Sequence, residues 1–184
     1  MADFIIKSAA GTGNKTLIQG QDQSGSAYAV QVNDAGATTL TNATITAWTP
    51  PAGTVLQIVQ ATTTTGADTT STSDVTTGLS KAITPSATSS KILVTMGITY
   101  DTQAGDRAIK YSLYKGGSIL VDKIGYAFCA GERVIGTWAA SYLDSPSTTS
   151  STTYELKYQS TGGSTVYGLY AGTFSSMTLT EIAG

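Results

Sequence analysis

The sequence predicts an all-β protein, in which a short-strand N-terminal β-meander is followed by a jelly-roll-like antiparallel β-sandwich. The first observation is composition, because the 184 residues include 33 Thr, 20 Ser and 20 Gly, which are typical of strands and turns. The second is the alternation of apolar and polar residues, the pattern of half-buried strands. The third is the close spacing of turn signals, without the fixed-period repeat of a β-helix.

Residues 1–48 contain short apolar runs separated by turn clusters such as AAGTGN and NDAGAT. Turn signals about every ten residues predict a small β-meander. Because so few large apolar residues build only a weak core, we expect this module to anchor the protein or to associate with other copies. The residues expected at an interface with other copies or with an assembly partner are Phe4, Ile5, Ile6, Leu17, Ile18, Tyr28, Val30 and Val32.

The segment TPPAG at 49–53 predicts a linker, because Pro50 and Pro51 stiffen the chain and cannot continue a central strand. Residues 54–184 form the predicted sandwich domain. Its first strand is predicted at 55–59, in VLQIV. The polar, low-complexity stretch 60–78 is interpreted as a long exposed loop or a β-excursion.

Alternation continues through the rest of the domain. In SSKILVTMGITYD one face is shared by Ile92, Val94, Met96, Ile98 and Tyr100. Lys115-Gly116-Gly117 predicts a hairpin. Further inward-facing residues are expected in the strands that follow: Ile109, Tyr111, Leu113, Val134, Trp138, Tyr142, Tyr154, Leu156 and Tyr158. TVYGLYAG and SMTLTEIA complete eight or nine strands with no helix, which indicates a two-sheet sandwich of jelly-roll or related Greek-key type.

Charge and residue usage narrow the function. A net charge of −2 with only ten scattered Lys and Arg argues against nucleic acid and against an anionic membrane as partners. Without His, the chain lacks the commonest general base and metal ligand, so we expect no enzyme activity, no cofactor and no metal. Cys129 is the only cysteine and is expected to be a buried apolar residue. The N-terminal apolar run is too short for a signal peptide, which favours synthesis in the cytoplasm, a reducing compartment.

Three groups of residues carry an alternative interpretation. Asp101 and Asp106 offer two carboxylates to Ca²⁺ but lack the usual loop spacing, so a polar hairpin loop is favoured. Glu132, Asp144 and Glu155 are candidates for glycoside cleavage, although nothing in the sequence brings any two together. Aromatic residues could stack on sugars, although most occupy inward positions. The three expected at the outer surface are Tyr126, Tyr167 and Tyr170.

From TPPAGTVLQIVQA onward, the sequence resembles a module found in tail-fibre and head-decoration proteins of tailed phages. The resemblance covers roughly 130 residues. It is carried by VLQIV, GLSKAITPSATSSKILV, SYLDSPSTTSSTTYELKY and SSMTLTEIA. The opening MADFIIKSAAGTGNKTLIQGQDQSG is similar to N-terminal modules of virion proteins that attach to the particle or begin a trimeric stem.

The resemblance implies a homotrimer with jelly-roll heads like those of the C1q and tumour-necrosis-factor domains. It brings no catalytic motif. We therefore expect a virion structural protein, a trimeric capsid decoration or cement protein that binds the major capsid protein or another virion protein. The alternative is a short tail-fibre or receptor-binding protein that recognises a host surface glycan.

Overall fold

The computed structural model describes residues 20–21, 27–28 and 49–184. The chain divides into two units, Met1–Trp48 and Thr49–Gly184. In the first unit, β1 (Gly20–Gln21) pairs with β2 (Ala27–Tyr28) in an antiparallel manner. The remainder of the predicted β-meander lies outside the described residues.

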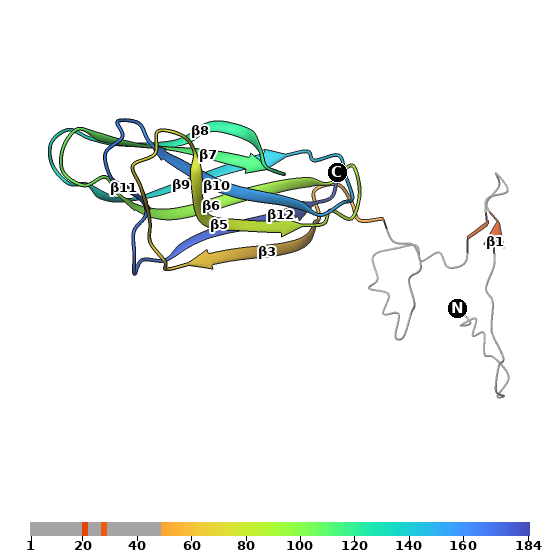
Figure 1. Ribbon diagram of the computed structural model, residues 1–184. Helices are drawn as coiled ribbons and strands as arrows, with labels where there is room; N and C mark the ends of the chain where they lie inside the picture. The colour runs from red at the N-terminus through yellow and green to blue at the C-terminus, as the bar shows by residue number, and fades with distance from the viewer. Residues whose placement is uncertain (1–19, 22–26, 29–48) are drawn as a thin grey trace, which may run out of the picture. The chain divides into compact units, whose positions relative to one another are not determined.

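The second unit is a sandwich of two antiparallel sheets (Figure 1). In the larger sheet, β6 lies between β12 and β9, and β3 pairs with the other side of β12. The short strands β11 and β4 join β6 at Asp101, beyond the residues that pair with β12. The bounds of this sheet are β3 (Val55–Thr63), β4 (Ala67–Thr69), β6 (Lys91–Asp101), β9 (Ile135–Asp144), β11 (Val166–Leu169) and β12 (Ser175–Ile182).

The smaller sheet has four strands in the order β5-β10-β7-β8. Its bounds are β5 (Val75–Ile83), β7 (Arg107–Lys115), β8 (Ser118–Cys129) and β10 (Thr152–Ser160). The predicted hairpin at Lys115-Gly116-Gly117 joins β7 to β8. The predicted all-β fold and two-sheet antiparallel sandwich are therefore confirmed.

The eight long strands pair in a nested order. The first, β3, pairs with the last, β12, and the second, β5, pairs with the seventh, β10. The third, β6, pairs with the sixth, β9, and the central pair is the β7–β8 hairpin. The linker and the C-terminus meet at one end of this unit, where the amide of Gly53 donates to the carbonyl of Ala183 at 2.8 Å.

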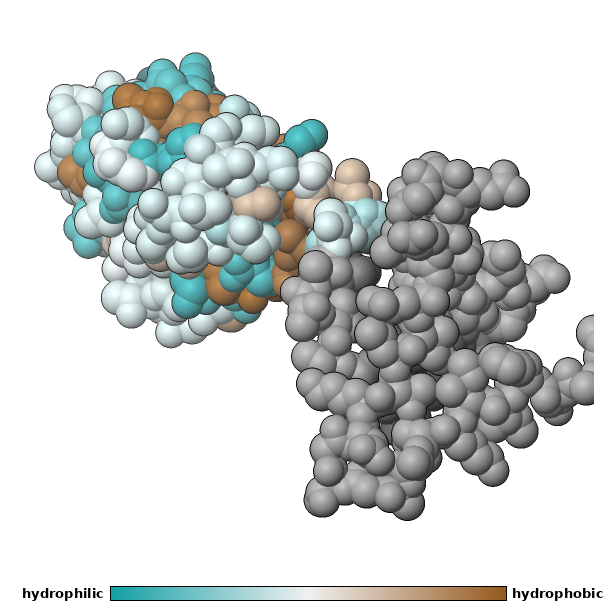
Figure 2. Space-filling view, turned by 90° about the vertical axis from the view of Figure 1, so that its right-hand side faces the viewer, coloured by the Kyte–Doolittle hydropathy of each residue, from teal (hydrophilic) through white to brown (hydrophobic). Residues whose placement is uncertain are grey.

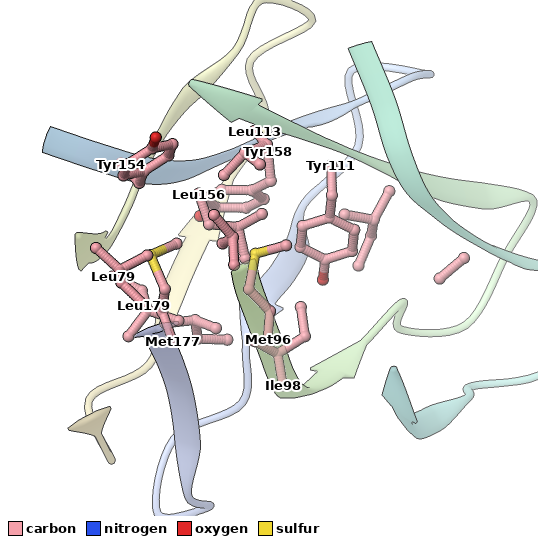
Figure 3. Close-up of a cluster of buried hydrophobic side chains, with 14 of the residues drawn as sticks. Leu79, Met96, Ile98, Tyr111, Leu113, Tyr154, Leu156, Tyr158, Met177 and Leu179 are labelled. Carbon is pink, nitrogen blue, oxygen red and sulfur yellow. The ribbon is translucent and has the colours of Figure 1, made fainter. Parts of the chain in front are cut away.

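The core fills the space between the two sheets (Figure 3). The larger sheet contributes alternate residues such as Ile98 and Leu179, and the smaller sheet contributes residues such as Leu156. Each is at most 1% exposed, and burial of such a side chain contributes about 1.5–3 kcal/mol. The buried side chains also confirm the predicted inward faces of β6, β7 and β10.

An aromatic stack crosses the core near β8. The rings of Tyr111 and Trp138 lie 5.3 Å apart and nearly parallel. Gly125 on β8 lies against the Trp138 ring, where a Cβ would come within 2.3 Å of ring atoms. The Tyr111 hydroxyl donates a hydrogen bond to the carbonyl of Gly168 at 2.9 Å, so the buried phenol has a polar partner.

Two sequence-based expectations need correction. The loop interpretation of 60–78 is wrong, because β3 continues to Thr63, β4 follows, and β5 begins at Val75. The alternative β-excursion fits better, since Thr can occupy a strand as readily as a polar loop. Val134 was expected to face inward, but it precedes β9 and is 36% exposed. Between residues 49 and 184 the structure has ten strands instead of eight or nine, and the strands that the sequence did not predict separately are β4 and β5.

Candidate functional site

Across its four long strands, the outer face of the larger sheet carries a single charged side chain, Lys91 at the start of β6, and its other residues are uncharged. Its residues alternate with the buried positions and are aligned by the pairing of β3, β12, β6 and β9. We call these residues the uncharged face: Ile58, Gln60, Thr62, Leu93, Thr95, Gly97, Thr99, Ile135, Thr137, Ala139, Ser141, Leu143, Ser176, Thr178 and Thr180.

Small polar groups and exposed aliphatic side chains share the uncharged face. Gln60 Nε2 donates to Thr178 Oγ1 at 2.9 Å, and Thr95 Oγ1 donates to the carbonyl of Thr178 at 3.4 Å. Ile58 is 62% exposed and Leu143 is 48% exposed. Because no ion has to be stripped of water, covering this face with protein costs less than covering a charged one.

The acids of the larger sheet's long strands are buried instead. Asp101 and Glu181 are 0% exposed, and Asp144 is 6% exposed. Each carboxylate has its own partners within the unit. This arrangement leaves the outer surface of the four long strands without negative charge.

Glu181 joins β12 to β3 and to the turn after β5. Its carboxylate accepts hydrogen bonds of 2.6 Å from the Ser86 amide, the Ser86 hydroxyl and Gln57 Nε2. Burial alone would raise the pKa of this carboxyl, but the hydrogen bonds outweigh burial and lower its pKa to about 2. Glu181 is therefore held as an anion through nearly the whole accessible pH range.

Asp101 fixes the loops at the end of the sandwich remote from the linker. Its carboxylate accepts hydrogen bonds from Arg133 Nε at 3.0 Å and from the Gln103 amide at 2.8 Å. Although burial acts to raise its pKa, these partners lower it overall. Arg133 also reaches the Tyr170 hydroxyl at 3.4 Å. Asp101, which the sequence offered as an alternative calcium ligand, is thus paired with an arginine.

Asp144 connects the two sheets. It ends β9, and its carboxylate accepts hydrogen bonds from Lys115 Nζ at 3.0 Å and from the Tyr154 hydroxyl at 2.6 Å. Burial, followed by this hydrogen bond, raises the pKa of Tyr154 well above its usual range. Glu155, a second candidate carboxylate, lies on the outer face of the smaller sheet, with Lys157 Nζ at 3.6 Å.

The outer face of the smaller sheet is charged and partly aromatic. Lys110 Nζ lies 2.8 Å from Asp122 and 3.7 Å from Asp74. Lys157 Nζ lies 4.4 Å from the centre of the Tyr114 ring. Figure 2 shows one end of the sandwich, where pale residues of intermediate hydropathy surround separate hydrophobic groups.

The predicted outer-surface aromatics differ in exposure. Tyr126 on β8 is 46% exposed, with Lys123 Nζ 4.4 Å from its ring centre, and Phe128 beside it on the same strand is 56% exposed. Tyr167 and Tyr170 are half-buried. Sequence reasoning missed Phe128, although its alternation with Tyr126 along β8 was available as a signal.

The remaining predictions concern Cys129, metal binding and the N-terminal interface residues. Cys129 is buried, as expected, and 3% exposed. In the part of the chain that the structure describes, no three His, Cys, Asp or Glu side chains are grouped to hold a metal ion. Tyr28 lies in β2, and the other seven predicted interface residues, Phe4, Ile5, Ile6, Leu17, Ile18, Val30 and Val32, lie outside the described residues.

Among the described residues, no helix is long and apolar enough to span a membrane. The uncharged face was not predicted as a site, because strand pairing is needed to assemble it from four separate segments. The described residues form two contrasting surfaces, which are the uncharged face of the larger sheet and the charged outer face of the smaller sheet. No protein-family model and no curated protein matches this sequence.

Proposed function

We propose that this chain is a structural protein of a tailed-phage virion, a trimeric capsid decoration or cement protein without enzyme activity. The observation that carries the proposal is the uncharged face. Its exposed aliphatic and hydroxyl side chains suit contact between protein subunits, which relies on buried area and shape rather than on catalysis. The partners are further copies of this chain and the major capsid protein or another virion protein.

The proposal includes a jelly-roll topology for the sandwich. The nested pairing of β3 with β12, β5 with β10 and β6 with β9 around the β7–β8 hairpin supports it. A ribbon of paired strands wrapped in this way produces two Greek keys and two packed sheets. The resemblance to phage head and fibre modules implies the same topology.

We place the contact between the three copies on the β3–β12 part of the uncharged face. Ile58 is the most exposed aliphatic residue there, and Thr178 lies beside Gln60 at the centre of the sheet. The N-terminal module, residues 1–48, then provides the attachment to the shell. Bound subunits stabilise the shell because they bind its assembled form and not its separated capsomers.

A binding experiment tests this function. Purified protein is mixed with undecorated capsids and, separately, with host cells, and the bound fraction is measured by sedimentation. We expect binding to capsids and loss of binding when residues 1–48 are deleted. At low concentration the full chain should have a light-scattering mass near three times the 18.9 kDa monomer. Binding to cells with no binding to capsids would overturn the cement function.

The second candidate is a short tail-fibre or receptor-binding protein that recognises a host glycan. Tyr126 and Phe128 favour it, because both rings are exposed on one strand and aromatic rings cover the apolar faces of sugars. Substitution Tyr126→Ser together with Phe128→Ser would then abolish binding to host cells. The same double substitution leaves capsid binding unchanged if the protein is a decoration protein.

A further inference from the structure

The strand β9 is an unprotected edge of the larger sheet. It pairs with β6 over ten consecutive residue pairs, from Ile135 to Asp144, without a register shift. In the described part of the chain no strand pairs with its other side. In an antiparallel strand, alternate residues direct both backbone groups to one side, so about half of the β9 residues offer unpaired donors and acceptors.

Other long edges carry the features that prevent strands of different molecules from pairing. The edge strand β8 contains Asp122 and Lys123, and its pairing with β7 shifts register twice. The edge strand β5 contains Lys81, and its pairing with β10 also shifts. Charges and bulges of this kind block edge-to-edge association. From Ile135 to Leu143, β9 has no charge, no proline and no bulge.

The fourth long edge, β3, is also uncharged, but it differs from β9 in two ways. Its pairing with β12 shifts register near Val55. The segment after β5 approaches it, since Gln57 Nε2 donates a hydrogen bond to the carbonyl of Thr84 at 2.7 Å. An edge with these irregularities is a poorer template for a straight added strand.

The sequence of β9 is complementary to itself in the antiparallel direction. If Ala139 lies opposite Ala139 of a second copy, Ile135 lies opposite Leu143, and Thr137 lies opposite Ser141. Ile135 and Leu143 are each 48% exposed, so in this pairing both exposed aliphatic residues of each copy are covered by the other copy. On the inward face of β9, Gly136 of one copy lies opposite Tyr142 of the other, and Ala140 lies opposite Trp138. This register places a small residue against each large one.

We propose that β9 pairs with β9 of a second copy around a two-fold axis at Ala139. The two larger sheets then form one continuous sheet, and the uncharged face continues across the junction. A two-fold contact is self-complementary and closes on itself. It is separate from the three-copy contact on β3 and β12, so it links one trimer to the next.

Cysteine cross-linking tests the register. Opposite Cβ atoms in an antiparallel pair lie about 5 Å apart, within reach of a disulfide. We expect Ala139→Cys to give a covalent dimer on a non-reducing gel. Ser141→Cys alone should not, because two Ser141 residues would lie about 13 Å apart along the strand. A mixture of Thr137→Cys and Ser141→Cys chains should give the dimer again.

The wild-type chain is the control, since its single Cys129 is 3% exposed and outside β9. Failure of Ala139→Cys to cross-link would overturn the proposed pairing. Equal cross-linking of Ser141→Cys would also overturn it, because only association without a fixed strand register would cross-link both positions equally. These two variants should fold alike, because both side chains are exposed on the uncharged face.

Charge swapping supplies a second test. Ala139→Lys places like charges opposite each other, and so does Ala139→Glu, whereas a mixture of the two pairs opposite charges. We expect the light-scattering mass of wild type to rise above three copies with concentration. Each variant alone should stop at three copies, and the mixture should recover the larger species. If neither variant differs from wild type, the two-fold contact is absent.

The two proposals fail in different ways. A three-copy mass without the Ala139→Cys cross-link overturns the β9 contact and leaves the trimer in place. The cross-link with a mass of two copies overturns the trimer and leaves the β9 contact in place. Light scattering and the gel therefore report on separate contacts.

Discussion

The two sheets of the sandwich treat charge in opposite ways. On the long strands of the larger sheet, the acids Asp101, Asp144 and Glu181 are buried, and Lys91 at the start of β6 is the one charged residue of the outer face. In the smaller sheet, Lys110 and Asp122 form an ion pair on the outer face. The two sheets belong to one sandwich and share its core, but their outer surfaces are very different.

This difference indicates which face of the sandwich is suited to bind other subunits and which face stays in contact with water. A face without ions loses little when protein covers it, whereas covering Lys110 and Asp122 removes two charges from water. The charged face of the smaller sheet keeps that side of the molecule hydrated. The uncharged face is the side suited to contact other subunits.

The largest effect is expected at Asp144, compared with Asp122. Each aspartate binds a lysine, at 3.0 Å in the Lys115–Asp144 pair and 2.8 Å in the Lys110–Asp122 pair. Asp144→Ala leaves Lys115 and the Tyr154 hydroxyl without their buried acceptor, so the free energy of unfolding should fall by about 3 kcal/mol. Urea unfolding followed by tryptophan fluorescence measures the change.

Asp122→Ala is the matched control and should leave the unfolding midpoint unchanged, because water replaces the exposed carboxylate. Asp144→Asn should lose less stability than Asp144→Ala, since an amide oxygen still accepts from Tyr154. Equal losses for Asp144→Ala and Asp122→Ala would contradict the contrast between buried and surface pairs.

The second effect is the acid sensitivity of Glu181. Its pKa is lowered from 4.5 to about 2 in the folded chain, so its carboxylate stabilises the fold by about 3 kcal/mol at neutral pH. The unfolded chain takes up the proton first as pH falls, so stability is lost below about pH 5. By pH 3 about 2 kcal/mol of this contribution should be gone.

Urea unfolding at pH 7 and pH 3 measures this loss, and Glu181→Gln is the comparison. The variant should be less stable at pH 7 and should show a loss between the two pH values about 2 kcal/mol smaller than wild type. The remaining slope includes Asp101, whose pKa is also lowered. An unchanged slope in Glu181→Gln would show that its hydrogen bonds to Ser86 and Gln57 do not hold the proton off.

The sequence predicted the inward faces better than the outer ones. Alternation places Ile98 inside and Thr99 outside from local pattern alone. It does not tell which strands are neighbours, so Thr95 of β6 and Thr178 of β12, 83 residues apart, were not expected on one surface. Nor does alternation locate the partners of Glu181, because Ser86 lies 95 residues away in a turn.

Strands were also hard to predict where the sequence has low complexity. The Thr-rich residues 60–78 contain few apolar side chains, so the pattern alone could not separate a loop from strands that pair through their backbone. Pairing with β11 and β12 determines the outcome there. Asp101 was predicted in a loop with Asp106, whereas the structure buries it beneath Arg133, a residue 32 positions later.

The smallest effect on stability, but a clear effect on association, is expected from a charge placed on the uncharged face. Thr178→Lys adds a lysine at the centre of the sheet, beside Thr95 and Gln60. A partly exposed position with room for a long side chain should change the free energy of unfolding by no more than about 0.5 kcal/mol. The light-scattering mass should fall from three copies to one, because the contact would then bury an unpaired charge.

Lys157→Thr on the smaller sheet is the matched control, since it makes the reverse exchange on the opposite outer face. It removes the contact with the Tyr114 ring but should leave the mass at three copies. If Thr178→Lys remains trimeric and Lys157→Thr does not, the copies meet through the charged face. The uncharged face of β3 and β12 would then be free to bind the shell, and the N-terminal module would hold the copies together.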